Sequence, residues 1–338
     1  MKVGWRGALG IVLSAALLWW VLRDQNFGAI WGVLAESNGA LWIASMVFAT
    51  VIFPLRARRW AALLEPVAGR LPFRSLWQST AVGMMVNNVV PARAGEFARA
   101  FALSRAEASV KFTAAFGSLA VDRLFDGTVV LLLMVLAMLD PAFGRASAGS
   151  TGTLVISMRF AGLFLAAVLA VLAMIVVAPA IVYTLHDAIM GRLAPRLSPR
   201  TRTLLEGFAS GLGVLRHPKL VAEVFFWTVL HWLCNAFAFW LGFRALGIDA
   251  PFSAALLIQG MIAIGVAIPS SPGFFGVFEA FGTVGLGFYG LNSTQAVSWA
   301  LGFHILSYIP ITLMGVWYLT RLKLHFRDFR AAGETSAA

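Results

Sequence analysis

Two hydrophobic segments interrupted by proline and glycine constrain the fold of this chain more than any other feature. In the first segment Pro91 and Gly95 stand four residues apart, and in the second Pro269 and Gly273 do the same. Neither segment reads as one continuous helix, because proline removes a backbone donor and glycine favours a break. Interrupted segments at corresponding places in two halves of a membrane protein are typical of a transport site.

The composition indicates an integral membrane protein and excludes a soluble one. Hydrophobic residues make up 60% of the chain and charged residues 12%, and the mean hydropathy is +0.83. In such a chain the net charge of +11 indicates membrane orientation and anionic lipid, and we expect no nucleic-acid partner. The one cysteine, Cys234, cannot form an intrachain disulfide.

Six segments are long and apolar enough to cross a bilayer, which needs roughly 20 residues per helix; they are residues 7–22, 40–55, 112–139, 158–183, 221–245 and 296–320. We interpret residues 7–22 as a retained first span, because no small-residue cleavage site follows the apolar run. Residues 184–220 form a cytoplasmic connector, within which leucines at helical spacing predict an amphipathic helix over 199–216.

The interrupted segments are predicted to be re-entrant hairpins over residues 75–104 and 252–288. If both hairpins return to the side from which they enter, most of the 26 Lys and Arg residues, including Arg56 and Arg59, fall on the cytoplasmic side with both termini. A full crossing by either hairpin would remove that bias. The predicted fold is therefore an all-α polytopic membrane protein with six transmembrane helices and two hairpins.

This topology divides the single transmembrane domain, residues 1–338, into two repeat units. Residues 40–139 form the first unit and residues 221–320 the second, in the opposite orientation. In an inverted repeat of this kind the hairpin tips are expected to meet near the middle of the bilayer.

Charged residues in the predicted span 112–139 are candidates for a polar route. Asp122 and Asp126 lie one helical turn apart, so they share a face, and Arg123 stands between them. Ionisable groups at membrane depth line a polar cavity or pair with one another. The alternative interpretation is a structural ion pair, in which Arg123 bridges an aspartate or reaches Glu96.

The hairpin tips are candidates for binding an anionic headgroup. A helix start with an arginine beside it attracts anions, which in the first hairpin points to Arg93. In the second hairpin the backbone amides at the helix start around Pro272 are expected to do the same, together with the hydroxyls of Ser270 and Ser271. We predict that substrate is bound by Asn87, Asn88, Arg93, Glu96, Arg99, Asp122, Arg123, Asp126, Ser270, Ser271, Gly273 and Glu279, with structural breaks at Pro91, Gly95, Pro269 and Pro272. Asn87 and Asn88 equally fit a role in satisfying backbone groups at the break.

The motifs of hydrolases, metalloproteases and nucleotide-binding proteins are not found in the sequence, and we expect no enzymatic activity, cofactor or metal. Two aspartates one turn apart on one helix are poorly placed to flank a bond that is to be cleaved.

Three motifs in order resemble the lysylphosphatidylglycerol synthase transmembrane-region family, whose members are described as flippase-like: Asn87-Asn88-Val89-Val90-Pro91-Ala92-Arg93-Ala94-Gly95-Glu96, Val121-Asp122-Arg123, and Ile268-Pro269-Ser270-Ser271-Pro272-Gly273. The resemblance covers about residues 5–320. It implies an inner-membrane protein that handles lipids. No segment resembles the soluble synthase domain of bifunctional members, so we expect no synthase activity.

These observations favour a translocase that moves a phospholipid or polyprenyl-type lipid headgroup between leaflets. One alternative is an intramembrane lipid-modifying enzyme that uses Asp122 and Asp126 as acid and base. Another is a scaffold of a lipid-synthesis complex that transports nothing. Beyond the membrane lipid, the sequence leaves open a second copy of the chain or a lipid-synthesis enzyme as partner.

Overall fold

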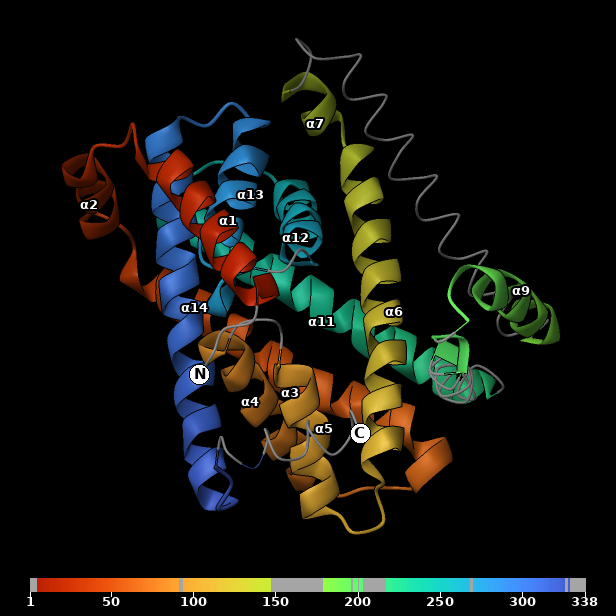
Figure 1. Ribbon diagram of the computed structural model, residues 1–338. Coiled ribbons are helices and arrows are strands. Elements are labelled where there is room, and N and C mark those ends of the chain that lie inside the picture. The colour runs from red at the N-terminus through yellow and green to blue at the C-terminus, as the bar shows by residue number, and fades with distance from the viewer. Residues whose placement is uncertain are drawn as a thin grey trace.

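In the computed structural model every regular element of the described part of the chain is helical (Figure 1). The structure describes residues 5–90, 94–146, 179–195, 197–199, 201–202, 217–267, 270–325 and 328. The predicted span 158–183 therefore lies outside the described residues up to residue 178, as does most of the predicted amphipathic helix.

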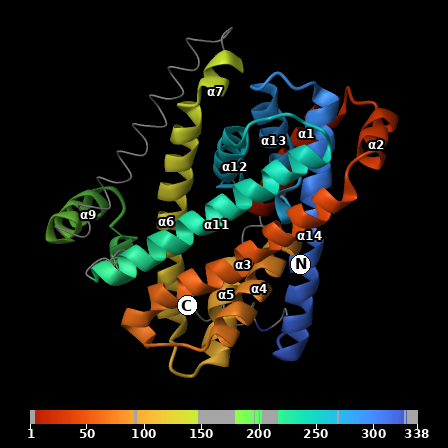
Figure 2. The ribbon, with the colours of Figure 1, turned by 180° about the vertical axis from the view of Figure 1, so that it is seen from behind.

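Two long helices cross the centre of the molecule side by side. These are α3 (Gly39–Ala68) and α11 (Pro218–Ala245), which run diagonally and antiparallel (Figure 2). The start of α3 is bonded to the end of α11, since the Asn38 amide donates to the Ala245 carbonyl at 2.8 Å. Further along the same pair of helices, the Ser45 hydroxyl donates to the Ala238 carbonyl at 2.7 Å.

The first interrupted segment forms a helical hairpin. Helix α4 (Phe73–Val89) ends just before the predicted break, and α5 (Gly95–Ala106) begins just after it. The two helices pack closely at Gly83, since a Cβ added there would stand 2.6 Å from the Arg99 Cβ and 2.7 Å from the Gly95 carbonyl oxygen. Glycine is thus required at Gly83 for the contact between the two arms.

The second interrupted segment has the same plan. It consists of α12 (Phe252–Ala267), the short 3₁₀ turn η3 (Pro272–Phe274) and α13 (Val277–Gly287). The connection, residues 270–276, is called the second tip below. Gly273 and Phe274 both have positive φ there, at 66° and 64°, so the chain turns through a conformation that costs a non-glycine residue about 1–2 kcal/mol.

Two further long helices each pack against both hairpins. Helix α6 (Phe112–Met138) packs on α5 and α12, and α14 (Ser293–Arg321) packs on α13 and α4. The main helix–helix contacts between α3 and α6 each have a counterpart between α11 and α14. In this correspondence α3 matches α11, α4 and α5 match α12 and α13, and α6 matches α14.

The remaining helices lie outside this framework. Helix α1 (Trp5–Leu22) packs on α13, and α2 (Phe27–Ala35) packs on α14 after a bend of 81°. Helix α7 (Pro141–Ala146) follows α6, and α9 (Pro179–Leu193) lies at the side of the molecule.

Three described helices are long and apolar enough to cross a membrane, namely α3, α11 and α14, and the bent pair α1–α2 adds a fourth if it is counted as one span. They contain the predicted spans 40–55, 221–245, 296–320 and 7–22. The predicted span 112–139 corresponds to α6, which has 27 residues but includes three charged side chains.

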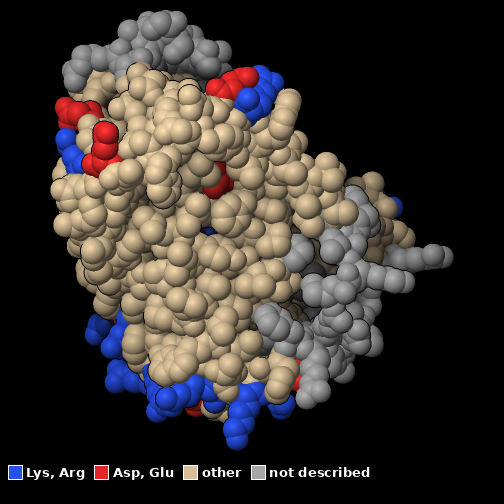
Figure 3. Space-filling view, turned by 90° about the vertical axis from the view of Figure 1, so that its left-hand side faces the viewer, with Lys and Arg blue, Asp and Glu red and all other residues tan. Residues whose placement is uncertain are grey.

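The surface carries a broad apolar belt between two charged ends (Figure 3). Side chains exposed on the membrane-type helices include Ile43, Phe226 and Leu313, with exposed fractions of 69%, 57% and 64%. Lys and Arg gather at one end, where α3, α5 and α14 finish. The other end carries ion pairs such as Arg244–Asp249 at 2.6 Å.

Helix α3 extends beyond the predicted span 40–55, and two basic residues counted on the cytoplasmic side are buried in it. It continues through Arg56 and Arg59, whose exposed fractions are 8% and 0%. Arg99, counted with the same cytoplasmic set, is also fully buried. The three guanidinium groups lie beside the carboxylates of α6.

Candidate functional site

A network of buried arginines and aspartates occupies the space between α3, α5, α6 and α11. At its centre Arg59, which is fully buried, contacts both aspartates of α6. Its Nη2 lies 2.6 Å from Asp122 Oδ1 and its Nη1 lies 2.6 Å from Asp126 Oδ1. The one-turn spacing of the aspartates explains this geometry, because it places both carboxylates on one face of α6 within the span of a single guanidinium.

Arg99 joins the network from α5, the second arm of the first hairpin. Its Nη1 lies 3.3 Å from Asp122 Oδ2, and its Nε donates to the Thr80 hydroxyl at 3.1 Å. The guanidinium also lies over the ring of Trp60, 4.0 Å from the ring centroid. This cation–π contact stabilises the buried charge, because the ring face is negative.

Arg56 is the least satisfied member of the network. Its Nη2 is 3.7 Å from Asp126 and 3.9 Å from Asp122, which is too long for a hydrogen bond. Its Nε and Nη2 are buried without hydrogen-bond partners. A buried cationic donor that lacks a partner is costly, so this guanidinium has capacity for an anionic ligand.

The edge of the network carries the ion pair predicted as the alternative interpretation. Arg123 pairs with Glu96 of α5 and lies 3.6 Å from Asp126. Together the network holds four arginines and three carboxylates, a formal excess of one positive charge: Arg56, Arg59, Arg99 and Arg123 against Asp122, Asp126 and Glu96. An excess cation inside an apolar bundle attracts an anion.

A second polar cluster lies at the second tip. The carboxylate of Glu279, fully buried at the start of α13, is 2.6 Å from His304 Nδ1 on α14. The other ring nitrogen, Nε2, is 2.8 Å from the Gly273 carbonyl. The rings of Phe275 and Phe278 stack on His304 with centroid distances of 4.4 Å each.

Backbone amides at the second tip, which we expected to bind an anion, are bonded within the protein. The Gly276 amide donates to Glu279 Oε2 at 2.6 Å. The Ser271 amide donates to the Ser14 hydroxyl of α1 at 2.8 Å. A ligand would have to displace these groups; the Ser270 hydroxyl, in contrast, is buried without a partner.

Asn87 and Asn88 make contacts inside the protein. The Gly95 amide donates to the Asn87 side chain at 2.8 Å, which joins the two arms of the first hairpin. The Asn88 side chain donates to Thr312 of α14 at 2.7 Å, and the Tyr308 hydroxyl donates to the Asn88 carbonyl at 3.1 Å. The predicted site residue Arg93 and the predicted breaks at 91 and 269 lie outside the described residues.

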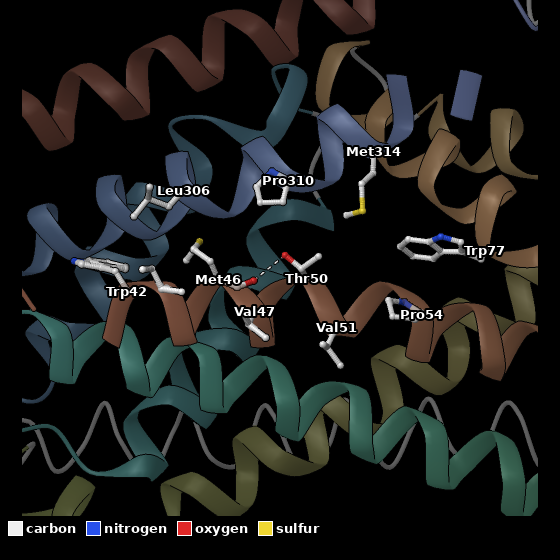
Figure 4. Close-up of a pocket in the computed structure, with 11 residues that line it drawn as sticks. Trp42, Met46, Val47, Thr50, Val51, Pro54, Trp77, Leu306, Pro310 and Met314 are labelled. Atoms are coloured by element: carbon white, nitrogen blue, oxygen red, sulfur yellow. Dashed lines mark hydrogen bonds between the residues drawn. The ribbon is translucent and has the colours of Figure 1, made fainter. Parts of the chain in front are cut away.

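An apolar groove of about 480 Å³ lies between α3 and α14 (Figure 4). Its two walls carry a proline each, Pro54 and Pro310, and Trp77 of α4 closes one end. The Thr50 hydroxyl in the wall donates to the Met46 carbonyl at 2.7 Å, so it is satisfied within α3. The groove is thus an apolar surface and separate from the charged network.

Sequence reasoning missed the α3 arginines of the network, together with Thr80 and the nearby His231. The signal for the arginines was present: Arg56 and Arg59 stand at i and i+3, and an apolar run continues through Leu64. That pattern is compatible with a helix that continues beyond residue 55 and carries both arginines on one face. In the part of the chain that the structure describes, no three His, Cys, Asp or Glu side chains are grouped to hold a metal.

Comparison with known proteins decides the family. Residues 7–315 match the family described as the lysylphosphatidylglycerol synthase TM region. The chain belongs to this family. It is therefore an integral membrane protein, and the resemblance inferred from the three motifs is confirmed.

Two curated relatives are similar to this member of the family. A UPF0104 membrane protein of Methanothermobacter thermautotrophicus is 23% identical over 332 residues, covering 92% of this chain and 94% of that protein. The glycosyltransferase AglD of Haloferax volcanii is 32% identical over 120 residues, covering 36% of this chain. The chain matches only 19% of the length of AglD.

Proposed function

We propose that this protein is a membrane lipid translocase, which moves the headgroup of a phospholipid or polyprenyl-type lipid between leaflets. The observation that carries the proposal is the buried charged network with its excess positive charge. Ionisable groups inside a membrane bundle are expensive and mark routes for polar cargo. A family named for a lipid synthase gives the cargo its class.

The proposed architecture is an inverted repeat of two units, residues 40–139 and 221–320, with six spans and two re-entrant hairpins. The matched contacts of α3 through α6 and α11 through α14 support it. So does the position of the two hairpins in different halves of the molecule (Figure 1). The end rich in Lys and Arg would face the cytoplasm with both termini, in the inner membrane of the cell.

In this proposal the anionic part of the headgroup binds on the side of the first hairpin. The unpartnered donors of Arg56 supply charge there, and Arg93 and the start of α5 lie next to one another in sequence. The N-cap residue of α5, Ala94, makes no side-chain cap bond; the Gly95 amide is bonded to Asn87, so a phosphate would bind at the amides that follow it. The acyl or prenyl chains would remain in the bilayer throughout.

The acid–base alternative is less well supported. Asp122 and Asp126 each lie 2.6 Å from Arg59, and a carboxylate neutralised by a guanidinium is a poor proton donor. The similarity to AglD covers too little of that protein to carry its activity to this chain. A scaffold without transport would leave the rate of lipid exposure equal to that of empty vesicles, so one assay separates it from a translocase.

The test is a leaflet-exposure assay in reconstituted vesicles with a fluorescent phospholipid. Vesicles with wild-type protein are expected to expose inner-leaflet lipid to an external quencher faster than empty vesicles, and Arg93→Ala is expected to slow this. Arg70→Ala serves as the matched control, because the Arg70 side chain is 91% exposed. Equal rates in wild-type, Arg93→Ala and empty vesicles would reject the proposal.

A further inference from the structure

The hydrogen bonds of the buried pair Glu279 and His304 determine how many protons the two side chains share. The Gly273 carbonyl can only accept, so His304 Nε2 at 2.8 Å must carry a proton. His304 Nδ1 faces Glu279 Oε1 at 2.6 Å. Either the imidazole carries both protons beside a carboxylate, or the carboxyl group carries one and the imidazole the other. Both forms are neutral as a pair and keep every bond.

Loss of one proton leaves the pair with a bond it cannot make. A carboxylate and a neutral imidazole share a single N–H between two oxygen acceptors, Glu279 Oε1 and the Gly273 carbonyl. A hydrogen bond to a carboxylate is stronger than one to a neutral carbonyl. The N–H therefore stays with Glu279, and the Gly273 carbonyl loses its donor.

In the part of the chain that the structure describes, no other charge lies beside the pair to compensate. Among the described residues, neither member of the pair forms an ion pair with any further group. Helix α12 carries no ionisable side chain, and α1 contributes the Ser14 hydroxyl. Tyr308 is the one titratable side chain of α14 that packs on the second tip, where it would contact a Cβ at Gly273. Deprotonation thus leaves a negative charge in an apolar setting sealed by two phenylalanine rings.

The bond that would be lost is the hydrogen bond between α14 and the second tip, which the stacking of Phe275 on His304 supports. Phe274, which is not a glycine, has a φ of 64°, and such a residue keeps this conformation only while surrounding contacts fix it. The tip also touches the first hairpin, since α4 packs on η3 and Tyr308 bonds the Asn88 carbonyl. Movement of the second tip therefore changes its contacts with the first hairpin.

We infer that Glu279 and His304 form a proton-binding site whose occupancy holds the second tip against α14, and that release of its proton to water frees the tip. In the protonated pair the proton bridges Nδ1 and Oε1; on release, the Nε2–H bond to the Gly273 carbonyl breaks and the remaining N–H bonds the carboxylate. Combined with the proposed translocase function, on which this step rests, the site couples lipid movement to protons.

The site itself is tested on purified protein without any transport. Infrared difference spectra between acidic and alkaline pH report the protonation of carboxyl and imidazole groups. We expect a pH-dependent signal in wild type that is lost in Glu279→Gln and in His304→Gln. Matched controls are Glu36→Gln and His186→Gln, which remove an exposed carboxylate and a histidine of α9. If neither tip variant folds, amide hydrogen exchange of residues 270–276 in the wild type, corrected for intrinsic rates and unchanged between acidic and alkaline pH, overturns the inference by itself.

The coupling is tested in vesicles with an imposed pH gradient and the fluorescent phospholipid. Wild type is expected to change its rate of lipid exposure when the gradient is reversed, and Glu279→Gln is expected to lose that dependence. Lipid movement that ignores the gradient, with identical spectra for wild type and Glu279→Gln, refutes the proton site and leaves the translocase intact. A proton signal without lipid movement refutes the translocase and leaves the site.

Discussion

Replacing Arg59 by methionine tests the charged network most sharply. The guanidinium is fully buried and lies 2.6 Å from each of Asp122 and Asp126. Removing one partner of a buried ion pair leaves an uncompensated charge and costs about 3–5 kcal/mol. Arg56 stays 3.7 Å or more from both carboxylates, too far to replace two close contacts. We therefore expect the free energy of unfolding to fall by about 3–5 kcal/mol.

The assay is reversible unfolding in mixed detergent micelles, followed by circular dichroism. Arg58→Met is the matched control, because Arg58 is exposed on the same helix and its main contact is a cation–π interaction with Phe73 at 4.3 Å; it should cost about 0.5–1 kcal/mol. Adding Asp122→Asn and Asp126→Asn to Arg59→Met should not recover the loss, because buried Arg56 and Arg99 then lose the carboxylates that they face. An Arg59→Met protein as stable as Arg58→Met would contradict the network.

Two further substitutions test the packing around the hairpin. Gly83→Ala should lower the free energy of unfolding by about 1–3 kcal/mol, because the added Cβ would overlap α5. The control is Gly127→Ala, whose Cβ meets nothing within 4 Å and which should be neutral or stabilising by up to about 1 kcal/mol. Equal effects of the two substitutions would refute the close contact. Trp60→Phe should lower the free energy of unfolding by about 1–3 kcal/mol, since it removes the 2.8 Å bond to the Ser118 hydroxyl and weakens the ring contact with Arg99. The control is Trp31→Phe, at a residue that is 72% exposed, which should change this free energy by less than about 0.5 kcal/mol. A similar change in both variants would show that the Trp60 contacts contribute nothing.

The sequence predicted the helical, membrane-embedded character of the protein and the places where its helices stop. Proline and glycine act locally on the backbone, so a reader of the sequence can locate the ends of α4 at Val89 and of α12 at Ala267 within a few residues. The family resemblance was carried by the same motifs. The inverted repeat and the number of spans remain predictions.

The partners of the charged residues could not be predicted in the same way. Arg59 meets Asp126 across 67 residues of chain, and such long-range contacts depend on how α3, α6 and α11 pack. Charge counting placed Arg56 and Arg59 on the cytoplasmic side of the membrane, and it carries no information about which carboxylates they contact. At the second tip the sequence showed free helix-start amides, whereas Ser14 arrives from a distant helix to bond one of them.

The most direct test of the account is the sidedness of the loops that flank the two hairpins. Single cysteines in a Cys234→Ser background, at Arg70 and Ala108 around the first hairpin and at Gly247 and Asn292 around the second, are labelled with a membrane-impermeant reagent in sealed, oriented vesicles. Both positions of the first pair should react from the cytoplasmic face, and both of the second from the opposite face. Members of one pair that react from opposite faces would mean that the hairpin crosses the membrane, and the inverted repeat would fall.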